Sequence, residues 1–204
     1  MWEIVFEFLP PVDLIHFGQI SKAAHMTVTR YSQRAFNVQR LLLPYFSDEN
    51  IKSFRQLQLF TGTVISGSTA LQFFDRTTYP ESDLDIYVEH RYCREVVWWL
   101  TSKGYSYRPR PTQPVSFNEA LQESAPAPNH AGAVFFSPDI SGYFGHGMAN
   151  VFDFVRYGSE RKIQLMSAHH CPLEIILDYH SSRLRYIVIV KKKLSDWWLY
   201  IYKM

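Results

Sequence analysis

The stretch that decides the fold is Val-Ile-Ser-Gly-Ser-Thr-Ala-Leu at residues 64–71, followed by Ser-Asp-Leu-Asp-Ile at residues 82–86. The first segment starts as a β-prone run, and its Gly-Ser pair opens a helical stretch that runs to about Phe74. The second segment begins the run 83–88, in which polar and apolar residues alternate as they do in a strand. We therefore expect a strand, a helix and a second strand, in that order.

The Gly67-Ser68 pair stands where the expected strand passes into the expected helix. Glycine allows unusual φ values and a close approach of the backbone to a ligand. The first amides of a helix point outward and favour an anion such as a phosphate, and Ser68 adds a hydroxyl donor at the same place. The pair is therefore a candidate phosphate-binding site.

Asp83 and Asp85 are two residues apart on the second expected strand, so their side chains should lie on one face. Leu84 and Ile86 should then face the core. Two neighbouring carboxylates repel each other unless a cation lies between them, and hard oxygen ligands suit Mg²⁺ or Mn²⁺. A phosphate cradle beside paired carboxylates is the equipment that metal-assisted nucleotidyl transfer needs.

The two segments together resemble the signature of the DNA polymerase β-like nucleotidyltransferase superfamily, in which a Gly-Ser pair begins a helix and an Asp-x-Asp strand follows. The resemblance covers roughly residues 62–180 and implies an α+β fold with a mixed sheet flanked by helices. It also implies that Gly67 and Ser68 hold the phosphates of a nucleoside triphosphate. Asp83 and Asp85 would then be the catalytic metal ligands, with Mg²⁺ or Mn²⁺ as cofactor.

The superfamily carries a third carboxylate on a later strand, and the matching strand here is expected at residues 162–166. The position of the acid then falls on Gln164, whose amide cannot take a proton from a hydroxyl. In another strand register Asp153 would fill the position. Two interpretations stay open: an enzyme that transfers a nucleotidyl group to a hydroxyl acceptor, and a degenerate member that keeps the fold without the chemistry.

The first part of the chain, residues 1–60, is expected to be a helical extension. Leu-Pro-Pro-Val-Asp-Leu at residues 9–14 and Ile-Ser-Lys at residues 20–22 resemble the middle of an F-box, the module that docks onto ubiquitin-ligase adaptors. This resemblance covers only residues 2–30. With the core that follows, the chain resembles nucleotidyltransferase-like proteins of fungi. The helices would either bind such an adaptor or only cap the sheet domain.

The rest of the chain is expected to form a nucleotidyltransferase-like domain at residues 61–182 and a C-terminal tail at residues 183–204. Within the domain, Gly-Ser at 158–159 between two β-prone runs predicts a hairpin. The tail has a lysine run at 191–193 and a tryptophan pair at 197–198. It fits either a basic-aromatic surface for RNA or anionic lipid, or an added strand or helix.

Composition narrows the class of protein. The net charge of +2 provides no basic field over the whole protein, so charge does not support nucleic acid as a partner. The two cysteines, Cys93 and Cys171, predict no disulfide framework. We find no signal peptide and expect an intracellular protein, cytoplasmic or nuclear. The apolar run at residues 186–190 is too short for a membrane span.

Overall fold

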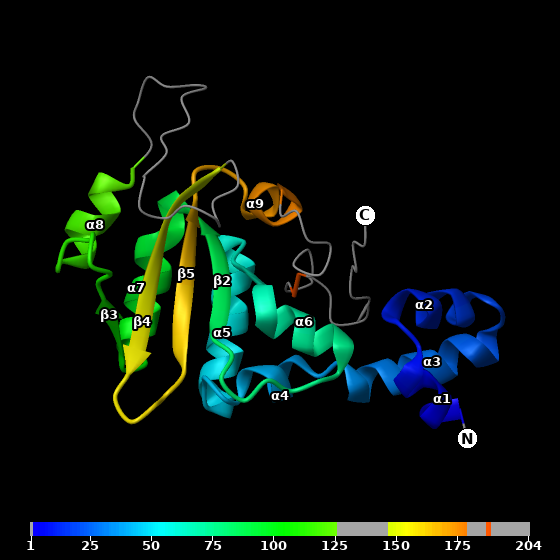
Figure 1. Ribbon diagram of the computed structural model, residues 1–204. Coiled ribbons are helices and arrows are strands. Elements are labelled where there is room, and N and C mark those ends of the chain that lie inside the picture. Colours follow the sequence, from blue (N-terminus) through cyan, green and yellow to red (C-terminus); the bar gives the residue numbers. More distant parts are fainter. Residues whose placement is uncertain (1, 126–146, 179–186, 189–204) are drawn as a thin grey trace.

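The computed structural model describes residues 2–125, 147–178 and 187–188, and it combines a five-stranded mixed sheet with helices (Figure 1). The α+β class expected from the sequence is confirmed. Most of the tail, including its lysine run and tryptophan pair, lies outside the described residues. In the part of the chain that the structure describes, no helix has both the length and the apolar character needed to cross a membrane.

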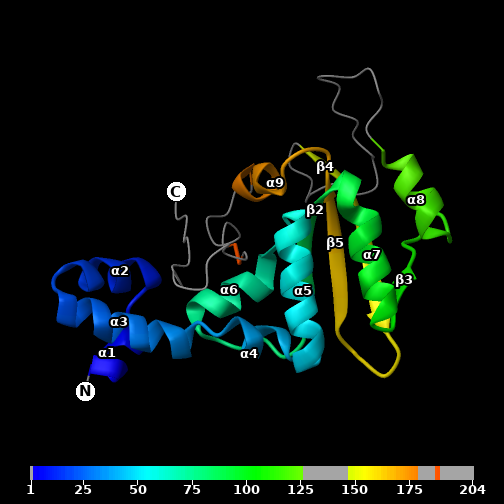
Figure 2. The ribbon, with the colours of Figure 1, turned by 180° about the vertical axis from the view of Figure 1, so that it is seen from behind.

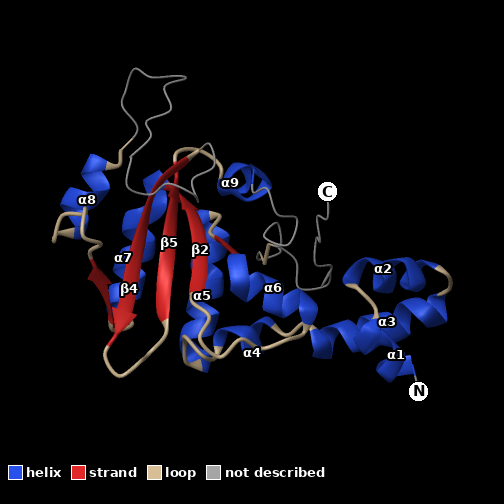
Figure 3. Cartoon of the chain, in the orientation of Figure 1, coloured by secondary structure: helices blue, strands red, loops and turns tan. Residues whose placement is uncertain are grey.

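The sheet has the strand order β1-β2-β5-β4-β3, with β2 and β5 parallel and all other neighbours antiparallel (Figure 3). The expected hairpin joins β4 to β5. The strand expected to begin at Asp83 begins one residue later, so Asp83 precedes the sheet. The strands are β1 (Val64–Ser66), β2 (Leu84–Glu89), β3 (Tyr105–Arg108), β4 (Met148–Arg156) and β5 (Lys162–Ala168).

Helices cover the sheet unequally. Figure 2 shows α5 and α7 over one face, whereas on the other face the described residues provide one helix, α9, which packs against one end. The helices in the described residues are α1 (Trp2–Phe8), α2 (Pro11–Gln19), α3 (Lys22–Ala35), α4 (Val38–Leu42), α5 (Asp48–Thr61), α6 (Gly67–Asp75), α7 (Cys93–Ser102), α8 (Phe117–Glu123) and α9 (Pro172–Asp178), with a 3₁₀ turn η1 (His90–Tyr92).

The alternation of β2 separates the two faces of the sheet. Leu84 and Ile86 are fully buried in the main core, which α5 and α7 complete. Tyr87, on the opposite face, belongs to a smaller apolar cluster with Ile175 and Ile176 of α9. Asp85 shares the face of Tyr87 but lies nearer the amino end of β2. The partly covered face therefore passes from apolar under α9 to polar around Asp85.

The N-terminal helices α1–α3 lie at one end of the molecule, beyond α6 (Figure 1). Phe6, Leu14, Val28 and Tyr31 form a separate apolar cluster there. Arg76, just after α6, donates hydrogen bonds to the carbonyl oxygens of Phe6 (3.1 Å) and Leu9 (2.8 Å). Helices α1–α3 are thus attached at the end of α6, whereas α4 and α5, which the sequence analysis placed in the same helical extension, pack into the main core with the sheet.

One described residue of the tail reaches the sheet. Val188 is 1% exposed and exchanges two backbone hydrogen bonds with Ile65, at 3.1 and 2.8 Å. The bridge is antiparallel and lies on the edge of β1 that β2 leaves open. At this residue the tail extends the sheet, as one of the two interpretations of the tail expects.

Candidate active site

A polar row crosses the partly covered face of the sheet. The strand registers place Ser66 opposite Asp85, Asp85 opposite Gln164, Gln164 opposite Asp153, and Asp153 opposite Arg108. Because side chains alternate along each strand, partners in register share a face. The question left open by the sequence is answered: Gln164 is the neighbour of Asp85, and Asp153 lies one strand further away.

Gly67 lies directly against Asp85. Its φ of 66° is in the left-handed region, and a Cβ atom built on it would overlap Asp85 Oδ2 and lie 2.9 Å from Cγ. The backbone N–H of Ser68 donates a hydrogen bond to the same carboxylate. The fold thus brings together the predicted phosphate-binding pair and one of the two predicted metal ligands.

The carboxyl group of Asp85 is costly to ionise in this position. Burial and, to a smaller extent, the charge of Asp83 raise its pKa to about 7, although the hydrogen bond from the Ser68 amide and the charge of Lys162 act in the opposite direction. The Oδ1 atom of Asp85 is buried and accepts no hydrogen bond. A buried oxygen without a partner is rare in proteins, and a bound cation would satisfy it.

Asp83 is positioned by the loop that enters β2. Its carbonyl oxygen accepts a hydrogen bond of 2.6 Å from Thr69 on α6. Gln72, also on α6, donates to Ser82 Oγ at 2.7 Å. The Asp83 side chain is 29% exposed and forms an ion pair with Lys162, with 3.3 Å between Oδ2 and Nζ. Helix α6 therefore fixes both ends of the site, through Gly67 and through this loop.

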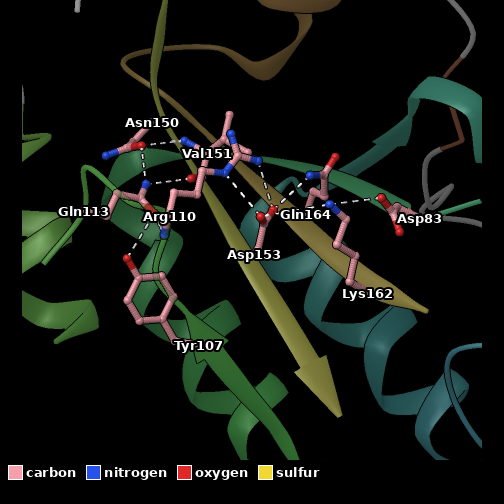
Figure 4. A network of polar contacts seen from close by, with 9 residues as sticks. All are labelled: Asp83, Tyr107, Arg110, Gln113, Asn150, Val151, Asp153, Lys162 and Gln164. Atoms are coloured by element: carbon pink, nitrogen blue, oxygen red, sulfur yellow. Dashed lines mark hydrogen bonds and ion pairs between the residues drawn. The ribbon is translucent and has the colours of Figure 1, made fainter. Parts of the chain in front are cut away.

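Asp153 is held by other protein groups (Figure 4). Its two oxygens accept hydrogen bonds from Arg110 Nη2 and Nε at 3.0 and 3.2 Å, and Gln164 Nε2 donates to Oδ1 at 2.9 Å. Burial alone would raise the pKa of Asp153, but these donors and Lys162 outweigh it and lower the pKa. The carboxylate is therefore ionised and already neutralised by the chain.

Two cationic residues of the site were not singled out from the sequence. Lys162 could have been found, because it precedes Gln164 by two residues on one strand and must share its face. Arg110 follows β3 in a loop and carries no such signal. Gln113 fixes this loop by donating to Asn150 Oδ1 and to the carbonyl oxygen of Val151, both at 2.8 Å (Figure 4).

The residues fit one divalent cation better than two. Among the described residues, no three His, Cys, Asp or Glu side chains are grouped closely enough to hold a metal ion. Asp83 and Asp85 are the two carboxylates that could hold one ion. The Gln164 amide nitrogen is committed to Asp153, so this residue can offer only its neutral oxygen.

Comparison of the chain with protein-family models, with curated proteins and with solved structures found no match.

Proposed function

We propose that the chain is a nucleotidyltransferase-fold protein that binds a nucleoside triphosphate together with a divalent cation at the β1–α6–β2 corner. One observation carries the proposal: the carboxyl group of Asp85 packs through Oδ2 against the left-handed Gly67 at the start of α6, and its other oxygen, Oδ1, is buried without a hydrogen-bond partner among the described residues. A side chain at position 67 would fill this space, and a carboxyl group would be costly to keep there without a ligand. Mg²⁺ or Mn²⁺ satisfies the chemistry of the carboxylate pair.

In this proposal, Gly67 and Ser68 bind phosphate oxygens, and Asp83 and Asp85 hold the cation. A bound cation would neutralise phosphate charge and lower the pKa of an attacking hydroxyl. The chain's own groups provide little for the proton transfer: Gln164 cannot act as a base, and Asp153 has a lowered pKa and is paired with Arg110. We therefore infer that the chain binds the nucleotide but transfers the nucleotidyl group to a hydroxyl acceptor slowly or not at all.

Calorimetric titration of ATP and GTP, with and without Mg²⁺, tests the proposal. Asp83→Asn should weaken Mg²⁺-dependent binding by at least about tenfold, because it removes one charged ligand of the cation. Asp75→Asn is the matched control, since Asp75 is exposed at the far end of α6. If the wild type and Asp83→Asn bound ATP with equal affinity in the presence of Mg²⁺, Asp83 would not be a ligand of the cation.

A second candidate function, binding to a ubiquitin-ligase adaptor, is favoured by the surface of the helical extension. Four large apolar side chains of α1 and its neighbour α2 are exposed: Trp2 by 56%, Ile4 by 68%, Phe8 by 82% and Ile20, after α2, by 73%. Such a concentration on a small helical module is typical of a protein interface. In this function the sheet domain would recognise a ligand and the helices would connect it to the adaptor.

A further inference from the structure

Lys162, on β5, lies between two carboxylates: Asp83, just before β2, and Asp153, on β4. Its Nζ atom is 3.3 Å from Asp83 Oδ2 and 4.0 Å from Asp153 Oδ2. Figure 4 shows the side chain extending from β5 toward Asp83, beside Gln164. A fixed positive charge is therefore built into the space between these acids, before any ligand binds.

Asp85 presents the opposite situation. Its Oδ1 atom is buried with no hydrogen-bond partner, although Lys162 is close enough to influence the carboxyl group electrostatically. The Lys162 ammonium is ion-paired with Asp83 and lies within 4.0 Å of Asp153, and neither of those carboxylates has a buried oxygen without a partner. Asp85 Oδ1 is thus an acceptor that a cation could occupy, while the carboxylates of Asp83 and Asp153 already have a positively charged side chain beside them.

We propose that the ammonium group of Lys162 takes the place of one of the two divalent cations of a nucleotidyl-transfer site, so that this site binds a single divalent ion. The inference rests on the proposed function for the identity of the site, and it adds the number of ions. A second ion would need a carboxylate at position 164, where the chain has glutamine. It would also need the space beside Asp83 that Lys162 occupies.

The ion that Lys162 would replace is the one that activates the attacking hydroxyl, so the replacement affects catalysis more than binding. Lys162 stands on the side of Asp83 that faces Gln164 and Asp153, where the third carboxylate would complete the ligands of the ion that activates the attacking hydroxyl. An ammonium group neutralises charge there, but it cannot bind and acidify a hydroxyl as a metal ion does. Asp83 and Asp85 would hold the single remaining ion, which would supply positive charge for binding a triphosphate.

The test is titration of Mn²⁺ alone, without nucleotide, into the full chain, followed by calorimetry and by the electron paramagnetic resonance signal of free Mn²⁺. The wild type should bind one ion. Lys162→Met should bind Mn²⁺ about tenfold more tightly, because the positive charge that is ion-paired with Asp83 has been removed. Lys162→Arg should behave as the wild type, and so should Lys52→Met, whose lysine is exposed on α5.

The gain in Lys162→Met should disappear in the double variant Asp83→Asn/Lys162→Met, because Asp83 is the carboxylate that Lys162 releases. Two ions or none in the wild type would overturn the inference. So would a Lys162→Met variant, folded by circular dichroism, that binds Mn²⁺ no more tightly than the wild type. Because no nucleotide is present, failure of the proposed function would appear separately, as Mn²⁺ binding without ATP binding.

Discussion

Gly67 has a left-handed backbone conformation and lies directly against the carboxyl group of Asp85. Alanine at this position would strain the left-handed backbone and push against the carboxyl group of Asp85. We expect Gly67→Ala to lower the free energy of unfolding by about 2–4 kcal/mol in urea titrations. Gly158→Ala, in the β4–β5 turn, has a similar φ of 74° but no atom within 4 Å of the added Cβ, and should cost only about 1–2 kcal/mol.

A double-mutant cycle separates the two causes. An Asp85→Ala background removes the overlap with Oδ2 and Cγ and leaves only a 3.1 Å contact with the Cβ atom of residue 85, so Gly67→Ala should there cost little more than Gly158→Ala does. Equal costs of the two glycine variants in the wild-type background would mean that Gly67 serves the turn alone and that the contact with Asp85 has no energetic weight.

Asp85 should make stability depend on pH in a direction opposite to most acids. Its folded pKa of about 7 is above the ordinary value of 3.8, so its contribution is complete below pH 3.8 and is lost as the pH rises through 7. Asp85→Asn should therefore gain roughly 2–3 kcal/mol relative to the wild type between pH 5 and pH 8 without divalent cations. Parallel pH profiles of the two proteins, measured by urea unfolding, would contradict the raised pKa.

The sequence predicts some residues of this site well and others not at all. Gly67 and Asp85 could be paired in advance, because a strand–helix–strand unit places the start of its helix beside the second strand. The place of Gln164 next to Asp85 depended on a parallel pairing between strands far apart in sequence, which local patterns leave undetermined. Arg110 could not be foreseen, because a loop brings it to Asp153.

Helix α6 connects the candidate site to the helical extension. It begins at Gly67, is about 13 Å long at 1.5 Å per residue, and is followed by Arg76 in the left-handed conformation with φ of 55°. The guanidinium group of Arg76 then caps the carbonyl oxygens at the end of α1 and donates to Tyr31. The sequence indicated the helical extension but not this attachment, which needs a single arginine in an uncommon backbone conformation.

A substitution on the exposed surface of α1 and α2 tests whether these helices bind a partner protein. If these helices bind a ubiquitin-ligase adaptor subunit, Phe8→Asp should weaken capture by the purified adaptor at least about tenfold, because large aromatic side chains dominate interfaces. Tyr157→Asp is the control, since Tyr157 is fully exposed on the distant β4–β5 turn. Wild-type protein that is folded and shows no association with the adaptor would remove this candidate function.

In the whole molecule, the helices of the described residues leave one region of the sheet uncovered. Helices α5 and α7 cover one face, and α9 covers the end of the other, so the row from Asp85 to Asp153 stays polar and partly exposed. Local alternating and helical patterns predicted most of the individual strands and helices, and the α+β class was expected from the family resemblance. The order of the strands was not predicted, because it depends on contacts between distant segments.

The proposed nucleotide and cation site is tested most directly by calorimetric titration of ATP into the wild-type chain with and without Mg²⁺. We expect the chain to bind one nucleotide, with an affinity that requires the divalent ion and is lower in Asp83→Asn. A folded protein that takes up no ATP and no GTP in either condition would contradict the nucleotide site, and would leave the helical extension as the part of the molecule with a candidate function.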